Sequence, residues 1–91
     1  MNFEWNPRKA QINSQKHGIS FTEAATVFGD ALAMTVPDPD HSDIEERYIT
    51  IVWSSLNRLL IISHTDRADR IRIISARELT PSERKAYEEE N

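Results

Sequence analysis

The sequence predicts an α+β fold: a small antiparallel β-sheet of three to four central strands with N-terminal helices and a C-terminal helix. Two observations carry this prediction. Residues 47–77 contain three alternating or apolar segments separated by short polar turns, which is the pattern of strands. Capping boxes of the form Ser/Thr-x-x-Glu begin at Ser20 and Thr80, and each marks the start of a helix. A chain of 91 residues allows one domain, so we expect a single domain over 1–91.

The N-terminus predicts one short strand and one helix. Residues 3–5 alternate apolar and polar side chains, as a short half-buried strand does. Asn6 suits the N-cap of a helix, and Pro7 suits its first position, where the missing N–H of proline is harmless. We therefore expect a helix over 7–17 that ends at Gly18, because glycine readily adopts the left-handed conformation that follows a helix.

The second helix is predicted to begin after Ser20 and to end at Gly29. Its apolar residues recur at the spacing of one helix face and would pack on the core. They are Phe21, Ala24, Ala25 and Phe28. A strand over 31–36 follows and stops at Pro37. The acidic segment 38–46 is predicted to be a loop.

The remaining strands should follow one another as antiparallel hairpins. Residues 47–54 alternate strictly, which indicates a strand with two different faces. Strands over 58–65 and 70–77 are apolar nearly throughout, so we expect both to be central and covered on both faces. His64 then falls on a core-facing position. A final helix over 81–89 carries little apolar surface and should dock weakly.

Composition excludes several classes of protein. There is no Cys, so a disulfide framework and a thiolate zinc site are excluded. The longest apolar run, 59–62, is far shorter than a bilayer span. Residues 1–5 lack the pattern of a secretory signal. We therefore expect a cytoplasmic protein that makes no membrane contact.

Charge is distributed unevenly along the chain. The formal net charge is −4, which by itself argues against nucleic acid as a partner. Between residues 58 and 77, however, five Arg and two Asp give a local balance of +3. Binding to phosphates depends on the charges in contact rather than on the total. The sequence therefore allows a basic face on an acidic protein.

Short motifs spread along nearly the whole chain occur in an order typical of one protein family. They are Phe3-Glu4-Trp5, Lys9-Ala10, Asn13, Lys16-His17-Gly18, Phe21-x-Glu23-Ala24, Val27-Phe28, His41-Ser42, Glu45-Glu46-Arg47, Arg58-Leu59, Thr65-x-Arg67 and the run from Ile71 to Arg77. Together they resemble the BrnT family of toxins from bacterial type II toxin–antitoxin pairs. One departure is Asn57, where the family often has Gly. Asn tolerates positive φ, so the turn should be preserved.

The resemblance implies a fold similar to the RelE-type ribonuclease toxins and metal-independent RNA cleavage that inhibits translation, with no cofactor. It also implies a BrnA-type antitoxin that neutralises the toxin, and operator DNA that is bound mainly through the antitoxin of the complex. A second hypothesis stays open: a non-catalytic regulatory module that binds a partner protein and contributes to operator binding. The net charge and the absence of a compelling acid–base pair favour that alternative.

RNA cleavage without a metal uses the 2′-OH as the nucleophile. The enzyme must then remove that proton, stabilise negative charge on phosphorus and protonate the leaving oxygen. Arginine suits the second task because its planar fork binds two phosphate oxygens. The candidate catalytic residues are Arg67, Arg77, Glu46 and Lys16. As alternatives, the two arginines could form surface ion pairs with Asp66, Asp69 or Glu78.

Strand direction should separate the arginines. If the last two strands are antiparallel neighbours, Arg67 lies close to Arg70 at their turn, whereas Arg77 lies close to Arg58 at the far end. Arg72 falls between the two ends, where it either serves the site or pairs with a carboxylate such as that of Glu46. A single phosphate site can therefore use only some of these residues.

The candidate substrate-binding residues are Arg47, Arg58, Arg72, His17 and Tyr87. Structural alternatives remain for several of them. Lys16 and His17 both suit the C-terminus of a helix, where the helix dipole favours cations. Tyr87 could instead anchor the last helix. His41 lies in the acidic loop at a spacing that matches no standard metal site, so no metal site is predicted.

Overall fold

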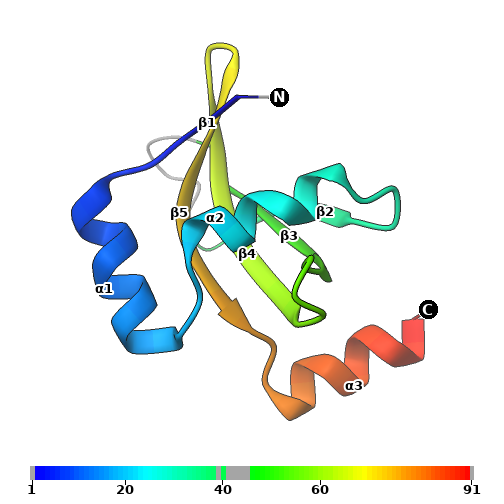
Figure 1. The fold of residues 1–91 in the computed structure, drawn as a ribbon. Coiled ribbons are helices and arrows are strands. Elements are labelled where there is room, and N and C mark those ends of the chain that lie inside the picture. The colour runs from blue at the N-terminus through cyan, green and yellow to red at the C-terminus, as the bar shows by residue number, and fades with distance from the viewer. Residues whose placement is uncertain (1, 39, 41–45, 91) are drawn as a thin grey trace.

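The computed structural model describes residues 2–38, 40 and 46–90. Its elements follow the predicted order of a strand, two helices, four strands and a helix (Figure 1). They are β1 (Asn2–Glu4), α1 (Pro7–His17), α2 (Phe21–Ala25), the 3-10 helix η1 (Thr26–Gly29), β2 (Met34–Pro37), β3 (Tyr48–Trp53), β4 (Leu59–Arg67), β5 (Arg70–Glu78) and α3 (Pro81–Glu90). The α+β class is confirmed. No helix within the described part of the chain is long and apolar enough to cross a membrane.

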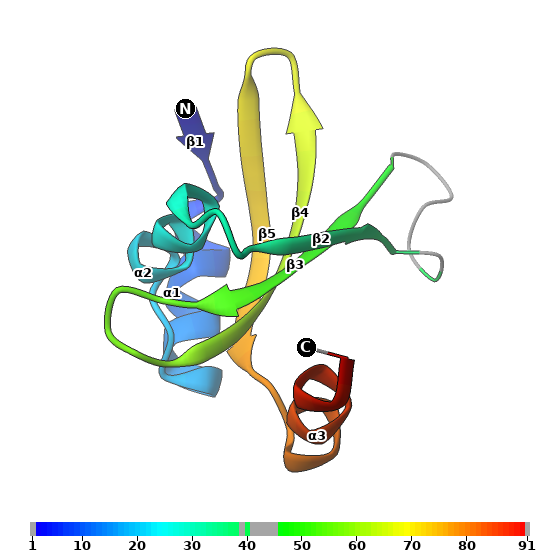
Figure 2. The ribbon, with the colours of Figure 1, turned by 90° about the vertical axis from the view of Figure 1, so that its right-hand side faces the viewer.

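The strands form one five-stranded sheet in the order β1-β5-β4-β3-β2. Strands β2 to β5 are antiparallel, as predicted, and β4 and β5 are central. The sheet is one strand wider than the predicted three to four, because β1 pairs in parallel with β5. At the turn between β4 and β5, Arg67 lies directly opposite Arg70. This turn and α3 lie at opposite ends of the molecule (Figures 1 and 2).

The hydrophobic core lies between the sheet and the N-terminal helices, on the side that we call the core face. Val52, Leu60 and Ile62 project from this face and are fully buried against Ile19 and other residues of the N-terminal segment. The opposite side, which we call the outer face, carries half-buried residues and is met by α3 at one end (Figure 2). Helix α3 contains no buried residue, which agrees with the weak docking expected from its sequence.

One polar side chain fastens α1 to the sheet. Asn13 is buried and donates hydrogen bonds to the carbonyl oxygens of Ile19, at 3.0 Å, and of Ala76, at 2.8 Å. Its own side-chain oxygen accepts from the N–H of Ala76 at 3.1 Å. Because a buried amide is costly unless its hydrogen bonds are made, these contacts fix the position of α1 against β5.

The helix ends follow the predicted capping residues. The side chain of Asn6 accepts from the N–H groups of Arg8 and Lys9, and Gly18 has the left-handed φ of 70°. Ser20 accepts from the N–H of Glu23 at 3.0 Å, which completes the predicted N-terminal cap of α2. Capping side chains satisfy backbone groups that a helix end leaves without partners.

One helix changes type inside its predicted bounds, and one predicted strand boundary was wrong. The second helix changes to 3-10 geometry at Thr26, where the Oγ1 atom donates to the carbonyl oxygen of Glu23 at 2.6 Å. The strand predicted over 31–36 begins only at Met34. The backbone N–H groups of Leu32 and Ala33 both donate to Asp30, which forms a local turn instead of joining the sheet.

Candidate functional site

Three arginines of the outer face gather near the β4–β5 turn. The register places Arg67 opposite Arg70 and Thr65 opposite Arg72. Because side chains alternate along a strand, all three arginines project from the same face of the hairpin. We call Arg67, Arg70 and Arg72 the tip arginines. Figure 2 shows this hairpin extending past the other strands, so a large ligand can approach it.

Arg67 and Arg70 form an exposed pair of like charges. Both residues are exposed, and neither makes an ion pair with any residue that the structure describes. The two-residue turn between them holds Ala68 at a φ of 58°, a backbone conformation that residues other than glycine rarely adopt. Like charges directly opposite on neighbouring strands are destabilising. A strained turn that presents two such cations suits the binding of an anion.

Arg72 is paired, but not with the predicted partner. Its Nη1 atom lies 3.3 Å from Oε2 of Glu4, and both side chains are 29% exposed. The predicted pairing with Glu46 is wrong, because β1 brings Glu4 beside Arg72 in the sheet. Such a partly exposed ion pair contributes only about 0–1 kcal/mol, so a phosphate could replace the carboxylate at little cost.

Glu46 lies at the same end of the sheet, next to Tyr48. The hydroxyl of Thr65 donates to the backbone carbonyl of Glu46 at 2.6 Å, which holds this residue beside β4. The Tyr48 hydroxyl donates to Oε2 of Glu46 at 2.8 Å. The hydrogen bond to this carboxylate raises the pKa of Tyr48, so the phenol keeps its proton at neutral pH. Glu46 and Tyr48 thus form a hydrogen-bonded acceptor and donor pair at this end of the sheet.

His64 is a core residue. It is buried, its Nε2 atom lies 2.6 Å from the hydroxyl of Thr50, and Phe28 meets its ring edge to face. Burial lowers the pKa of His64, which favours the neutral imidazole. The ring also stacks on Tyr48, with centroids 5.9 Å apart. The interpretation of His64 as a core histidine is confirmed, and its position helps to fix Tyr48.

Arg58 is engaged in a partly buried ion pair at the other end of the sheet. Its Nε donates to Oε2 of Glu23 at 2.9 Å, and its Nη2 donates to Oε1 of Glu23 and to the carbonyl of Gly18. The Ser54 hydroxyl also donates to Oε2 at 2.6 Å. Hydrogen bonding from Arg58 holds the pKa of Glu23 below its usual range. We therefore interpret Arg58 as a residue that joins α2 to the β3–β4 turn.

Arg77 is bound to the start of α3. Its Nη1 and Nη2 atoms donate to the two carboxylate oxygens of Glu83, at 2.7 and 3.0 Å. The suggested ion-pair partners of Arg77, which were Asp66, Asp69 and Glu78, were wrong, because Glu83 of α3 supplies the carboxylate. Glu83 also accepts from the N–H of Thr80 at 2.8 Å, which completes the predicted second capping box. These hydrogen bonds, the one from Arg77 above all, lower the pKa of Glu83 to about 2.

The other predicted residues lie apart from the tip arginines. Lys16 and His17 end α1 beside Gly18, whose carbonyl binds Arg58. Tyr87 lines a cavity of about 230 Å³ between α3 and the apolar outer face. This position fits its alternative role as the anchor of α3. Arg47 is half-buried, next to Glu46, and its Nε atom is inaccessible to solvent.

The structure thus divides the predicted site residues between two ends. Glu46, Arg47, Arg67 and Arg72 lie at the tip end, whereas Lys16, His17, Arg58, Arg77 and Tyr87 lie at the α3 end. Two candidates, Arg70 and Tyr48, were missing from the predicted site. The sequence did contain a signal for Arg70. A two-residue turn after Arg67 places Arg70 directly opposite Arg67 on the next strand. Tyr48 had no such signal, because its contact with Glu46 depends on how the chain enters β3.

No cluster of three potential metal-ligating side chains occurs among residues 2–38, 40 and 46–90. His41 and most of the acidic segment around it lie outside the described residues. The interpretation of that segment therefore stays a prediction.

Comparisons with known proteins identify similar chains. The model of one family, described as the ribonuclease toxin BrnT of type II toxin–antitoxin systems, matches residues 5–83. Among solved structures, the crystal structure of the Brucella abortus ribonuclease toxin BrnT is similar, with a TM-score of 0.65 and 19% sequence identity. The alignment covers 88% of this chain and 97% of that chain. At this identity the likeness shows the fold alone. A comparison with curated proteins found no match.

Proposed function

Because this chain belongs to the BrnT family of ribonuclease toxins of type II toxin–antitoxin systems, we propose that it cleaves RNA without a metal at the tip end of the sheet. The observation that carries this placement is the pair Arg67 and Arg70. These two exposed cations lie opposite each other, and neither has an ion-pair partner in the described part of the chain. Two arginines at the other end, Arg58 and Arg77, are already engaged with carboxylates.

The tip arginines would bind the phosphate at which RNA is cut. Attack by the 2′-oxygen on phosphorus places extra negative charge on the non-bridging oxygens. Arg67 and Arg70 can hold these oxygens with charge-assisted hydrogen bonds, which are about twice as strong as neutral ones. Arg72 would join them when the phosphate displaces Glu4. Donors fixed in place before the reaction stabilise such charge without further rearrangement.

Glu46 and Tyr48 would move the protons. The carboxylate of Glu46 accepts the proton of the 2′-OH, and the phenol of Tyr48 donates a proton to the departing 5′-oxygen. Tyr48 stacks on the core residue His64, on the opposite face of the sheet from the tip arginines, so the RNA must pass over the end of the sheet to meet both groups. The products are then a 2′,3′-cyclic phosphate and a free 5′-hydroxyl. Lys16 and Arg77 lie at the other end of the sheet, so we place them outside the catalytic site, although they were first predicted to belong to it.

Type II toxin–antitoxin families include a protein antitoxin as a partner of the toxin. We propose that a BrnA-type antitoxin binds this chain in the cytoplasm and stops RNA cleavage. Operator DNA would be bound through the toxin–antitoxin complex, with the antitoxin making most of the contacts. The net charge of −4 supports this division, because the toxin alone is a poor polyanion binder away from its tip.

The alternative is a non-catalytic module that binds a partner and operator DNA. One observation favours it: Arg77 and Arg58, two of the predicted RNA-contacting residues, are held in ion pairs. Purified protein incubated with end-labelled RNA in EDTA separates the two functions. The ribonuclease should cut and leave cyclic phosphate ends. Intact RNA at micromolar protein, together with expression that does not slow cell growth, would support the binding module instead.

A further inference from the structure

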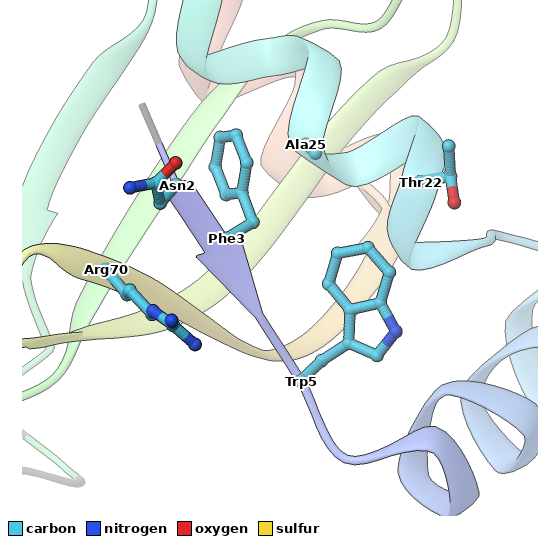
Figure 3. Close-up of a pocket in the computed structure, with 6 residues that line it drawn as sticks. All are labelled: Asn2, Phe3, Trp5, Thr22, Ala25 and Arg70. Carbon is cyan, nitrogen blue, oxygen red and sulfur yellow. The ribbon is translucent and has the colours of Figure 1, made fainter.

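A cavity of about 510 Å³ opens beside β1, close to the tip arginines (Figure 3). Its lining residues come from β1, α2, β5 and the segment that follows β1. They are Asn2, Phe3, Trp5, Thr22, Ala25 and Arg70. The volume falls in the range of roughly 300–1,000 Å³ that is usual for small-molecule sites. Of these lining residues, the chemistry assigned to the tip end uses only Arg70.

Two aromatic rings form one side of the cavity. Figure 3 shows the rings of Phe3 and Trp5 both turned toward α2. Phe3 packs on Phe28 with centroids 5.3 Å apart, and Trp5 meets Phe21 in an edge-to-face contact at 5.9 Å. These contacts hold the two rings in place, and both residues are only partly buried. Fixed and accessible aromatic surface is the usual platform on which a nucleobase stacks.

Polar groups complete the lining. Asn2 and Thr22 are exposed and offer both donors and acceptors, which the edge of a base requires. Arg70 reaches the cavity from the first position of β5. The same arginine lies opposite Arg67 at the tip. The rings face α2 on the core side, whereas Arg67 and Arg70 project from the outer face, so a ligand that contacts both must pass over the edge strand β1.

From this geometry we propose that the cavity is a nucleobase subsite. It would hold the base of a nucleotide next to the scissile bond, while Arg67 and Arg70 hold the phosphate. The inference rests on the proposed function, because it names the part of the RNA that this end of the molecule recognises. It also adds a source of base preference, since Asn2 and Thr22 would contact the edge of the base.

The two tryptophans of the chain provide a direct test. Trp53 lies on β3, under the guanidinium of Arg84, and does not line the cavity. In a ¹H–¹⁵N spectrum, each indole N–H gives one signal, and Trp53→Phe assigns them. Titration with 3′-AMP, 3′-GMP, 3′-CMP and 3′-UMP should shift the Trp5 signal and leave that of Trp53 in place. Ribose 5-phosphate, which lacks a base, should leave the Trp5 signal unchanged. No shift with any nucleotide, or an equal shift with ribose 5-phosphate, would overturn the proposal.

A variant that fills the cavity provides the second test. Thr22 is exposed, so Thr22→Phe should fold normally and occupy the space of the base. It should abolish the nucleotide-induced shift of Trp5 and raise the KM for RNA about tenfold, in line with the loss of one stacked base. Gln15→Phe, at an exposed position of α1, is the matched control and should change neither quantity.

The two readouts separate failure of the subsite from failure of the enzyme. If the wild-type protein cuts RNA and Thr22→Phe keeps its KM and its nucleotide preference, the subsite is refuted and the ribonuclease stands. If the Trp5 signal responds to nucleotides in a protein that cuts no RNA, the subsite stands and the catalytic proposal is refuted.

Discussion

At the scale of single residues, the arginines differ by whether a carboxylate of the protein holds them. Arg58 and Arg77 each bind one carboxylate through two nitrogens. Arg72 makes a single longer contact with Glu4, and Arg67 and Arg70 make none among the described residues. Bidentate pairs fix geometry as well as charge. Arg58 and Arg77 should therefore matter for stability, and the tip arginines for binding.

Replacing Glu23 by Gln should destabilise the fold. The buried carboxylate accepts from both Arg58 and Ser54, and Gln would offer only one acceptor oxygen in its place. We expect a loss of about 1–2 kcal/mol in the free energy of unfolding, which is less than for a fully buried pair because Arg58 is 33% exposed. Urea denaturation measures this loss. Glu88→Gln, which breaks the exposed pair with Arg84, should change stability by less than about 0.5 kcal/mol. Equal losses in the two variants would contradict this assignment.

Stability should also fall in acid, partly through Glu83. Its pKa in the folded protein is about 2, below its ordinary value of 4.5, so the unfolded chain binds a proton first as the pH falls. The stabilisation is complete above about pH 4.5 and disappears as the pH falls toward 2. Because Glu83 is 37% exposed, solvent screening keeps the effect below about 1 kcal/mol. Thermal unfolding at pH 7, 4 and 2.5 should show a smaller acid-induced drop in Glu83→Gln than in wild type. The same drop in both would assign the acid sensitivity to other groups.

At the scale of elements, the β4–β5 turn combines backbone strain with the predicted function. Ala68 has a φ of 58°, whereas Asn57 adopts a φ of 61° in the β3–β4 turn with a side chain that tolerates it. Alanine has no polar side chain that could form a local hydrogen bond and so offset the cost of a positive φ. The strain is confined to the turn that sets Arg67 opposite Arg70.

Replacing Ala68 by Gly should stabilise the protein by about 0.5–1 kcal/mol, because glycine adopts this φ without a Cβ clash. The control is Ala31→Gly, a turn position without positive φ, which should lose stability through backbone entropy. Urea denaturation of both variants shows whether the free energy of unfolding rises in Ala68→Gly and falls in Ala31→Gly. A loss of stability in Ala68→Gly would show that the turn is not strained.

The helices were predicted well because their ends depend on nearby residues. Asn6, Gly18 and Ser20 act within a few positions of themselves, and each forms the cap that its residue type suggests. The parallel pairing of β1 with β5 joins segments about 70 residues apart, and no local pattern encodes it. The change of the second helix to 3-10 geometry at Thr26 likewise depends on one side-chain hydrogen bond.

At the scale of the whole molecule, the sheet separates two groups of charged residues. Strand direction alone predicted that Arg67 and Arg77 would lie at opposite ends, and the register confirms it. The partners of the paired arginines could not be predicted in the same way. Glu4 and Glu83 reach Arg72 and Arg77 from the two chain ends, and these docked positions depend on packing over the entire fold.

The central claim is that RNA is cut at the tip end and not at the α3 end. Its most direct test is the single-turnover rate of RNA cleavage by Arg67→Gln and Arg77→Gln, with thermal unfolding of each variant measured alongside. Arg67→Gln should cut at least about a hundredfold more slowly, as expected for the loss of one fixed donor to a developing anion, and should keep its melting temperature. Arg77→Gln should cut within about threefold of wild type and melt at a slightly lower temperature, because a partly exposed bidentate pair worth up to about 1 kcal/mol is lost. If Arg77→Gln loses as much activity as Arg67→Gln at a temperature where both are folded, the catalytic site is not at the tip.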